Sequence, residues 1–185
     1  METINPAPTG ADVALLGLLA EAPMHPWEIT RQVEYREMRT WTDLAKSTVY
    51  KQLHSLEARG LAASEETVVS GRARRTYRLT PAGRRALADG VAHHLAAVET
   101  PHWAIDIATY NIDALPPDEA ITALDAYAAT LRERNEGWAA LEAFLRDVDG
   151  CPPHRWALAR RARAMIAGEL AWIAEFQADL RGTGR

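Results

Sequence analysis

The chain has 185 residues, enough for one domain with its own core or for a small domain plus a helical extension. Hydrophobic residues make up 48% and charged residues 25%, which excludes a largely disordered chain. Cys151 is the single cysteine, so an internal disulfide is excluded, and the sequence leaves open whether this thiol has any role.

The formal net charge of −4 is unevenly distributed. Lys and Arg number 12 against 11 Asp and Glu in residues 1–90, but 9 against 14 in residues 91–185. The acidic excess lies in the C-terminal half, so a local basic patch remains compatible with the first half. The longest apolar run, residues 13–20, is too short to span a bilayer, and no basic segment precedes it. We therefore expect a cytoplasmic protein without a membrane partner.

Three helices are predicted in the first sixty residues. The first runs from Thr9 or Gly10 to Glu21 and is apolar around much of its circumference, and the second starts at residues 25–28 and fades near residues 38–40. The third spans residues 47–60, where Val49, Leu53 and Leu56 form a stripe for burial and Gly60 ends the helix. At 100° per residue, its outward face carries small, polar and cationic side chains: Ser47, Lys51, His54, Ser55 and Ala58, flanked by Thr48 and Tyr50.

A basic hairpin is predicted next. Two β-prone runs, residues 61–69 and 74–79, flank a Gly-containing gap at residues 70–73. Residues 72–85 contain no acid and six arginines, namely Arg72, Arg74, Arg75, Arg78, Arg84 and Arg85. Guanidinium groups on a hairpin tip reach phosphates, and the adjacent helix with its polar outer face favours this reading over a merely solvated loop. Thr80 as N-cap and Pro81 in the first turn begin the following helix.

The C-terminal half is predicted to be helical. A connecting helix over residues 81–99 is interrupted at Thr100-Pro101, and residues 102–113 resume a helix. A long helix then opens at residues 116–118, and a last one follows the breaker at residues 150–153. The long helix has a heptad seam: Leu124, Tyr127, Leu131, Arg134, Trp138, Leu141, Leu145 and Val148. Two long amphipathic helices joined by a short turn are expected to pack antiparallel. Packing within one chain is the general expectation for the seam. A DNA-binding winged helix of this size usually needs a second copy to bind a two-fold operator, which favours a seam between two chains.

Residues 12–85 resemble the PadR-type winged-helix transcriptional regulators. The resemblance rests on Leu15-Leu16-Gly17-Leu18-Leu19, Met24-His25-Pro26-Trp27-Glu28-Ile29, Thr48-Val49-Tyr50, Gly60-Leu61, Gly71-Arg72-Ala73-Arg74-Arg75 and Tyr77-Arg78-Leu79-Thr80 with Gly83. The C-terminal half is similar to the helical dimerisation region of longer members, at residues 115–120 and 169–173. Pro26-Trp27 replaces the usual Gly-Tyr, and Tyr50-Lys51 replaces Tyr-Pro, which places a cation on the outward face of the third helix.

The resemblance implies a mainly α fold with a small β-hairpin wing, in which a winged helix-turn-helix is joined to antiparallel C-terminal helices. Residues 1–90 would be the DNA-binding domain, and residues 91–185 the dimerisation and effector domain. A homodimer would bind a double-stranded DNA operator, usually as a repressor, without a cofactor. Thr48 and Tyr50 would contact the phosphates, and Arg72, Arg74 and Arg75 would contact DNA from the wing. Lys51 and His54, which are taken from the helical projection, would lie in the major groove. Ser47 would contribute through its hydroxyl or the amides at the start of the helix.

Other functions are weighed against this one. The sequence has no Gly-rich phosphate loop, serine elbow or zinc-spaced Cys/His set, so an enzyme is not expected, and the adjacent His93 and His94 do not suit one metal ion. A small, flat aromatic effector is predicted to contact Trp103 and Trp138, although packing alone explains a tryptophan on the seam. The remaining alternative is a small-molecule or protein-binding winged-helix adaptor with no operator of its own.

Overall fold

The computed structural model describes residues 7–69 and 72–182, apart from the side chains of residues 46, 67–69, 72 and 73. The chain divides into two compact units, Met1–Thr100 and Pro101–Arg185. We describe each unit by itself.

The first two helices begin where local capping predicts. Helix α1 (Gly10–Glu21) starts after Thr9, whose hydroxyl accepts from the Asp12 N–H while the Asp12 carboxylate accepts from the Thr9 N–H. Helix α2 (Pro26–Tyr35) starts after His25 with a matching pair of bonds to Glu28, and a short 3-10 turn η1 (Met38–Thr40) follows. The predicted starts of both helices are confirmed.

Helix α3 (Lys46–Ala58) is the third helix of the first unit. Val49, Leu53 and Leu56 are fully buried, as their spacing predicts. Gly60, with φ of 70°, takes the left-handed conformation that directs the chain into the hairpin.

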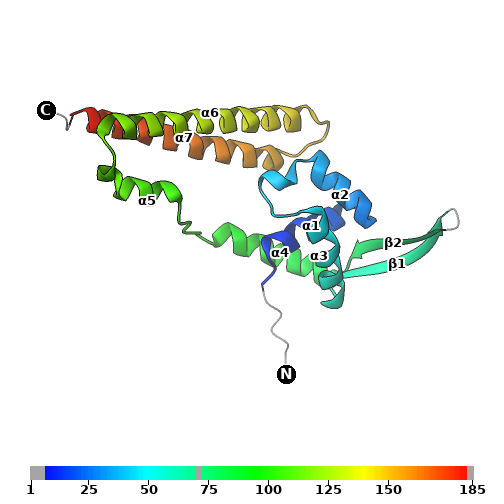
Figure 1. Ribbon diagram of the computed structural model, residues 1–185. Helices are drawn as coiled ribbons and strands as arrows, with labels where there is room; N and C mark the ends of the chain where they lie inside the picture. Colours follow the sequence, from blue (N-terminus) through cyan, green and yellow to red (C-terminus); the bar gives the residue numbers. More distant parts are fainter. Residues whose placement is uncertain (1–6, 70–71, 183–185) are drawn as a thin grey trace, which may run out of the picture. The chain divides into compact units, whose positions relative to one another are not determined.

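The hairpin consists of β1 (Ala62–Val69) and β2 (Arg72–Leu79), which pair antiparallel from Ala62↔Leu79 to Val69↔Arg72. It projects away from the helices of the first unit (Figure 1). Met24, just before α2, pairs with Tyr77 through two backbone hydrogen bonds of 2.9 Å, so the base of the hairpin is tied to the helices. The second strand starts at Arg72 rather than at the predicted residue 74, because the ladder extends to the pair Val69↔Arg72.

Helix α4 (Pro81–Ala96) packs along α1 and begins with the predicted cap. The Thr80 hydroxyl accepts from the Gly83 N–H at 2.9 Å. A Cβ at Gly83 would lie 1.9 Å from the Leu61 carbonyl oxygen, so only glycine allows this approach of α4 to the end of α3. The helix ends at Ala96, earlier than the predicted residue 99.

One core holds the first unit together. Its buried side chains come from α1, α2, α3, β2 and the segment before α3, and include Leu15, Leu16, Ile29, Leu44, Val49, Leu53, Leu56 and Tyr77. Burying each such aliphatic side chain contributes about 1.5–3 kcal/mol. The three helices and the hairpin base are therefore fixed relative to one another.

The second unit contains α5 (Ala104–Tyr110), a 3-10 turn η2 (Ile112–Ala114), and two long helices, α6 (Pro117–Asp147) and α7 (Pro153–Gly182). The long helices lie side by side (Figure 1). They are antiparallel, because Glu142 near the end of α6 binds Arg163, whereas Asp125 near its start binds Gln177. Among the described residues, no helix is both long and apolar enough to cross a membrane.

The heptad seam of α6 is filled within the chain. Leu124, Ala128 and Leu131 pack with Ile166 and Ile173 of α7. These positions of α6 therefore face α7 of the same chain, and the intermolecular seam stays a prediction. The antiparallel pairing itself was predicted and is confirmed.

Candidate nucleic-acid interface

Helix α3 presents a polar face opposite its buried stripe. Ser47, Lys51 and His54 are exposed, Tyr50 has 42% of its surface exposed, and Thr48 is half-buried. The structure thus brings all five predicted contacts of this helix onto its outer side and flank. These side chains present hydroxyl, ammonium and imidazole groups, which suit base edges and phosphates.

A buried carboxylate holds α3 against α1. Asp12 is 1% exposed and accepts hydrogen bonds from Gln52 Nε2 at 2.6 Å and from Arg59 Nη1 at 2.9 Å. Burial alone raises the pKa of Asp12, but the bonds from Arg59, Thr9 and Gln52 outweigh it and leave the pKa below its ordinary value. No local sequence pattern indicates this cluster, because Gln52 and Arg59 are distant from Asp12 along the chain.

Two arginines of β2, Arg74 and Arg75, bind acidic residues of the helices. Arg74 Nη2 lies 2.5 Å from Glu28 Oε1 of α2, in a pair that is exposed on both sides. Arg75 Nη2 lies 2.7 Å from Glu57 Oε2 of α3. The side chain of Arg72 lies outside the described residues. Arg74 and Arg75 therefore sit within reach of α2 and α3, a placement that the basic run in the sequence did not indicate.

Arg75 belongs to a network that joins three elements. Its Nε donates to Ser64 Oγ of β1 at 2.8 Å, and Ser64 Oγ donates to Glu57 Oε1 at 2.5 Å. The guanidinium also lies over the Tyr77 ring, 5.4 Å from its centre. The hydrogen bond from Ser64 lowers the pKa of Glu57, burial raises it, and the hydrogen bond from Arg75 lowers it further. The pKa of Glu57 therefore lies below its ordinary value.

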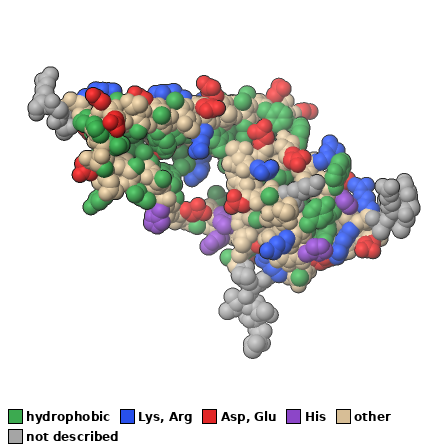
Figure 2. Space-filling model, in the orientation of Figure 1, with side chains coloured by type: hydrophobic (Ala, Val, Ile, Leu, Met, Phe, Trp, Pro, Cys, Tyr) green, Lys and Arg blue, Asp and Glu red, His purple; other side chains and the backbone are tan. Residues whose placement is uncertain are grey.

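Acidic side chains accompany the basic ones around the hairpin. Figure 2 shows blue and red side chains interspersed on the visible face of the first unit. Glu66 lies across the ladder from Arg75, and Glu65 lies across from Thr76; both are exposed. Arg78 is exposed on the same strand and has no ion pair among the described residues. The wing therefore has a mixed surface rather than the uniformly basic one that residues 72–85 predict.

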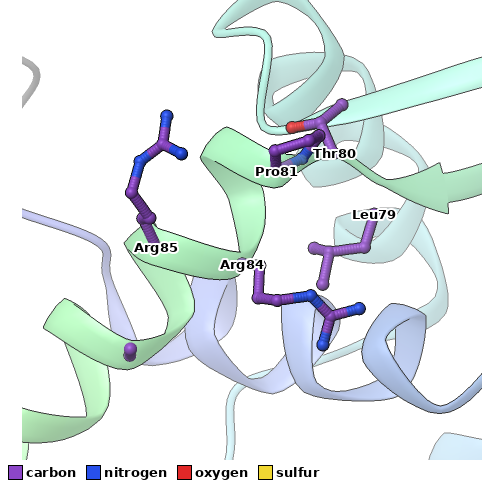
Figure 3. Close-up of a pocket in the computed structure, with 6 residues that line it drawn as sticks. Leu79, Thr80, Pro81, Arg84 and Arg85 are labelled. Atoms are coloured by element: carbon purple, nitrogen blue, oxygen red, sulfur yellow. The ribbon is translucent and has the colours of Figure 1, made fainter.

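A shallow hollow lies at the start of α4. Its lining residues are Leu79, Thr80, Pro81, Arg84, Arg85 and Ala88. The side chains of Arg84 and Arg85 leave the helix in different directions and do not converge on one point (Figure 3). The hollow thus lacks the converging polar groups of a ligand site.

The second unit contains a cavity of about 410 Å³ between its helices. Trp103 and Trp138, both predicted to contact an effector, line it together with Tyr127, Leu131, Arg134, Arg161, Ala162, Met165, Ile166 and Glu169. The Tyr127 hydroxyl donates to Glu169 Oε1. Burial, followed by this bond, raises the pKa of Tyr127 to about 12, so the phenol stays protonated.

Other reactive groups are not gathered into a site. In the described parts of the chain, no cluster of three or more His, Cys, Asp or Glu side chains is placed to hold a metal ion. The rings of His93 and His94 lie edge to face, 5.4 Å apart, and Cys151 is a half-buried free thiol.

Known proteins with this sequence pattern and fold are transcriptional regulators. Residues 15–89 match the transcriptional regulator PadR-like family. The chain is 59% identical over 46 residues to transcriptional regulator Rv3488 of Mycobacterium tuberculosis, a match that spans 25% of this chain and 43% of that protein. The chain thus matches less than half the length of this relative.

Solved structures share the fold along nearly the whole chain. Bacillus subtilis PadR in complex with operator DNA is 18% identical, with a TM-score of 0.76 over 93% of this chain and 99% of that one. Bacillus subtilis PadR in complex with p-coumaric acid is 19% identical, with a TM-score of 0.74 over 92% and 98%. The predicted fold class is confirmed. Residues 15–89 of the chain thus match the PadR-like family, a family of transcriptional regulators and not of enzymes.

Proposed function

We propose that the chain is a DNA-binding transcriptional repressor that acts as a homodimer and is released by a small aromatic effector. The observation that carries DNA binding is the outer face of α3, where Lys51, His54 and Ser47 are exposed above a fully buried apolar stripe. An exposed helix with polar side chains on its outer face fits the major groove, and its buried apolar side holds the helix in place on the protein.

The roles of the individual residues follow from their positions. Lys51 and His54 face outward from the middle of α3 and would contact base edges, whereas Thr48 and Tyr50 on the flank would contact phosphates. Ser47 lies in the first turn, where free backbone N–H groups also favour a phosphate. Arg72 and Arg74 would contact phosphates from the wing; the Arg74–Glu28 pair is exposed and therefore costs little to exchange for a phosphate.

A mobility shift tests DNA binding, with the duplex upstream of the chain's own gene as probe and an unrelated duplex of equal length as competitor. We expect Lys51→Ala to weaken binding to the upstream duplex by about tenfold, the loss of one good base or phosphate contact. Arg132→Ala removes an exposed cation from the second unit and serves as the matched control. Equal affinities for the two duplexes in the parent would instead favour a winged-helix adaptor without an operator.

A second copy of the chain has an apolar surface available on α5. Ile107 is 68% exposed and Tyr110 is 88% exposed, whereas the seam of α6 is already covered by α7. Exposed apolar side chains of this size on one short helix favour a protein partner, and a two-fold operator calls for a second copy. We expect Ile107→Ser with Tyr110→Ser to shift sedimentation towards the monomer, while Ala108→Ser on the same helix does not. A parent that sediments as a monomer would exclude the homodimer.

The cavity of the second unit suits an aromatic carboxylate. Trp103 and Trp138 offer apolar walls, and Arg134 and Arg161 offer cations at the rim. Because p-coumaric acid is the ligand in one of the similar Bacillus subtilis structures, we choose it as the probe. We expect it to quench tryptophan fluorescence and to release the upstream duplex, and 4-vinylphenol, which lacks the carboxylate, to do so more weakly. Trp103→Ala should weaken the quenching titration, and an unchanged midpoint would remove this tryptophan from the site.

A further inference from the structure

A polar network of Glu57, Ser64 and Arg75 connects the hairpin to α3. It joins α3, β1 and β2 through three hydrogen bonds of 2.5–2.8 Å. Each polar group has a partner within the network, and the Arg75 guanidinium also covers the Tyr77 ring. A charge-assisted network with this many partners fixes geometry better than an isolated surface ion pair does.

The network lies beside the outer face of α3. Glu57 is one turn after His54, whose Nδ1 is 4.0 Å from Glu57 Oε2, and the His54 ring meets the Tyr77 ring edge to face. Tyr77 is 1% exposed and belongs to the core of the first unit. Arg75 and Tyr77 are two residues apart on β2 and so lie on the same face of the hairpin, towards α3.

We propose that Glu57 and Arg75 are positioning residues, which set the angle between the wing and α3, and that Arg75 does not bind phosphate. The inference rests on the proposed DNA binding by α3. It assigns Arg75 a different role from the phosphate contact that the sequence predicts. It also explains why a carboxylate, which DNA repels, stands on the helix proposed to bind DNA.

The two possible roles of Arg75 predict opposite changes in DNA affinity when Glu57 is removed. If Arg75 contacts phosphate, removing Glu57 frees the guanidinium and removes a repelling charge, so DNA affinity rises. If the pair positions the wing, removing Glu57 breaks the polar contact of β1 and β2 with α3, and affinity falls. The direction of the change for Glu57→Ala therefore separates the two roles.

The experiment measures affinity for the upstream duplex by fluorescence anisotropy over a range of salt concentrations, for Glu57→Ala, Arg75→Ala and the double variant. We expect each single change to weaken binding by about tenfold and the double variant to lose little more, because both changes break the same network. The slope of log affinity against log salt should stay that of the parent, whereas loss of a phosphate contact would lower it by about 0.9. Tighter binding by Glu57→Ala, a lower slope for Arg75→Ala, or unchanged affinity in both would overturn the proposal.

Three further variants complete the design. Glu65→Ala removes the same charge from an exposed position on β1 and should leave affinity unchanged or slightly raise it. Glu57→Gln keeps one of the two oxygen acceptors, which can still bind Ser64 or Arg75, so it should retain more affinity than Glu57→Ala. It replaces the alanine variant if that protein does not fold. Lys51→Ala tests the proposed base contact from α3 on the same duplex: if it binds like the parent while Glu57 and Arg75 remain coupled, the contact of Lys51 fails and the positioning role stands.

Discussion

The two units of the chain satisfy their apolar surface in different ways. The first unit encloses a core in which Leu15, Leu53 and Leu56 are fully buried, and it adds a buried polar cluster around Asp12. The second unit has one seam between α6 and α7 and leaves Ile107 and Tyr110 largely exposed. A domain with a closed core holds its geometry alone, whereas a helix pair with exposed apolar residues gains stability from a further surface. The first unit is therefore suited to fixed presentation of α3, and the second to association.

The largest expected effect lies in the core of the first unit. Leu53→Ala leaves a cavity beneath α3 and should lower the free energy of unfolding by about 2–5 kcal/mol. Chemical unfolding followed by circular dichroism measures it. The matched change in the second unit is Leu131→Ala, which should cost less, because one face of a helix pair relaxes more readily than an enclosed core. Equal losses at the two positions would contradict the contrast between the units.

The next effect concerns the approach of α4 to the end of α3. Gly83→Ala would place a methyl group 1.9 Å from the Leu61 carbonyl oxygen, so α4 must shift, at a cost of about 1–3 kcal/mol or more. Gly168→Ala in α7 has open space around the added Cβ and should be neutral or slightly stabilising. Thermal unfolding of both variants compares a close contact in one unit with an open helix surface in the other.

The buried carboxylate gives the first unit a defined pH dependence. Because the pKa of Asp12 in the folded protein lies below its ordinary value, its stabilising contribution is present above about pH 4 and is lost as pH falls through the lower folded pKa. Asp12→Asn should destabilise the parent by about 3 kcal/mol near neutral pH and flatten the acid limb of its stability curve. Urea unfolding at several pH values measures both effects, and an acid limb as steep as that of the parent would contradict the role of Asp12.

The smallest effect is the loss of one helix cap. Thr80→Ala removes the acceptor of the Gly83 N–H and the donor to the Gly60 and Leu61 carbonyls. It should cost about 1 kcal/mol. A Thr80→Ser variant keeps the hydroxyl and should recover most of the loss, as thermal unfolding will show.

Local patterns predicted most of the helices and their faces. Thr9 and Thr80 cap the helices that follow them, and Val49, Leu53 and Leu56 are buried together, because caps and helical periodicity act within four residues. The start of β2 was misplaced, since the length of a hairpin turn depends on the ladder that closes it. Trp103 and Trp138 were singled out separately, and the packing of the second unit brings them to one cavity.

The sequence by itself determined the winged-helix order of elements, the outer face of α3 and the resemblance to PadR-type regulators. Only the tertiary structure decided which residues of the chain the arginines of β2 bind, and which helix covers the apolar positions of the heptad seam. Arg75 carries the same charge wherever it lies, but its partner Glu57 is 18 residues away, and the Arg74 partner Glu28 is 46 residues away. Periodicity indicates which side of a helix or strand is apolar, and charge indicates which kind of group a side chain attracts. Neither indicates which residue becomes the partner, because that depends on contacts made by the whole fold.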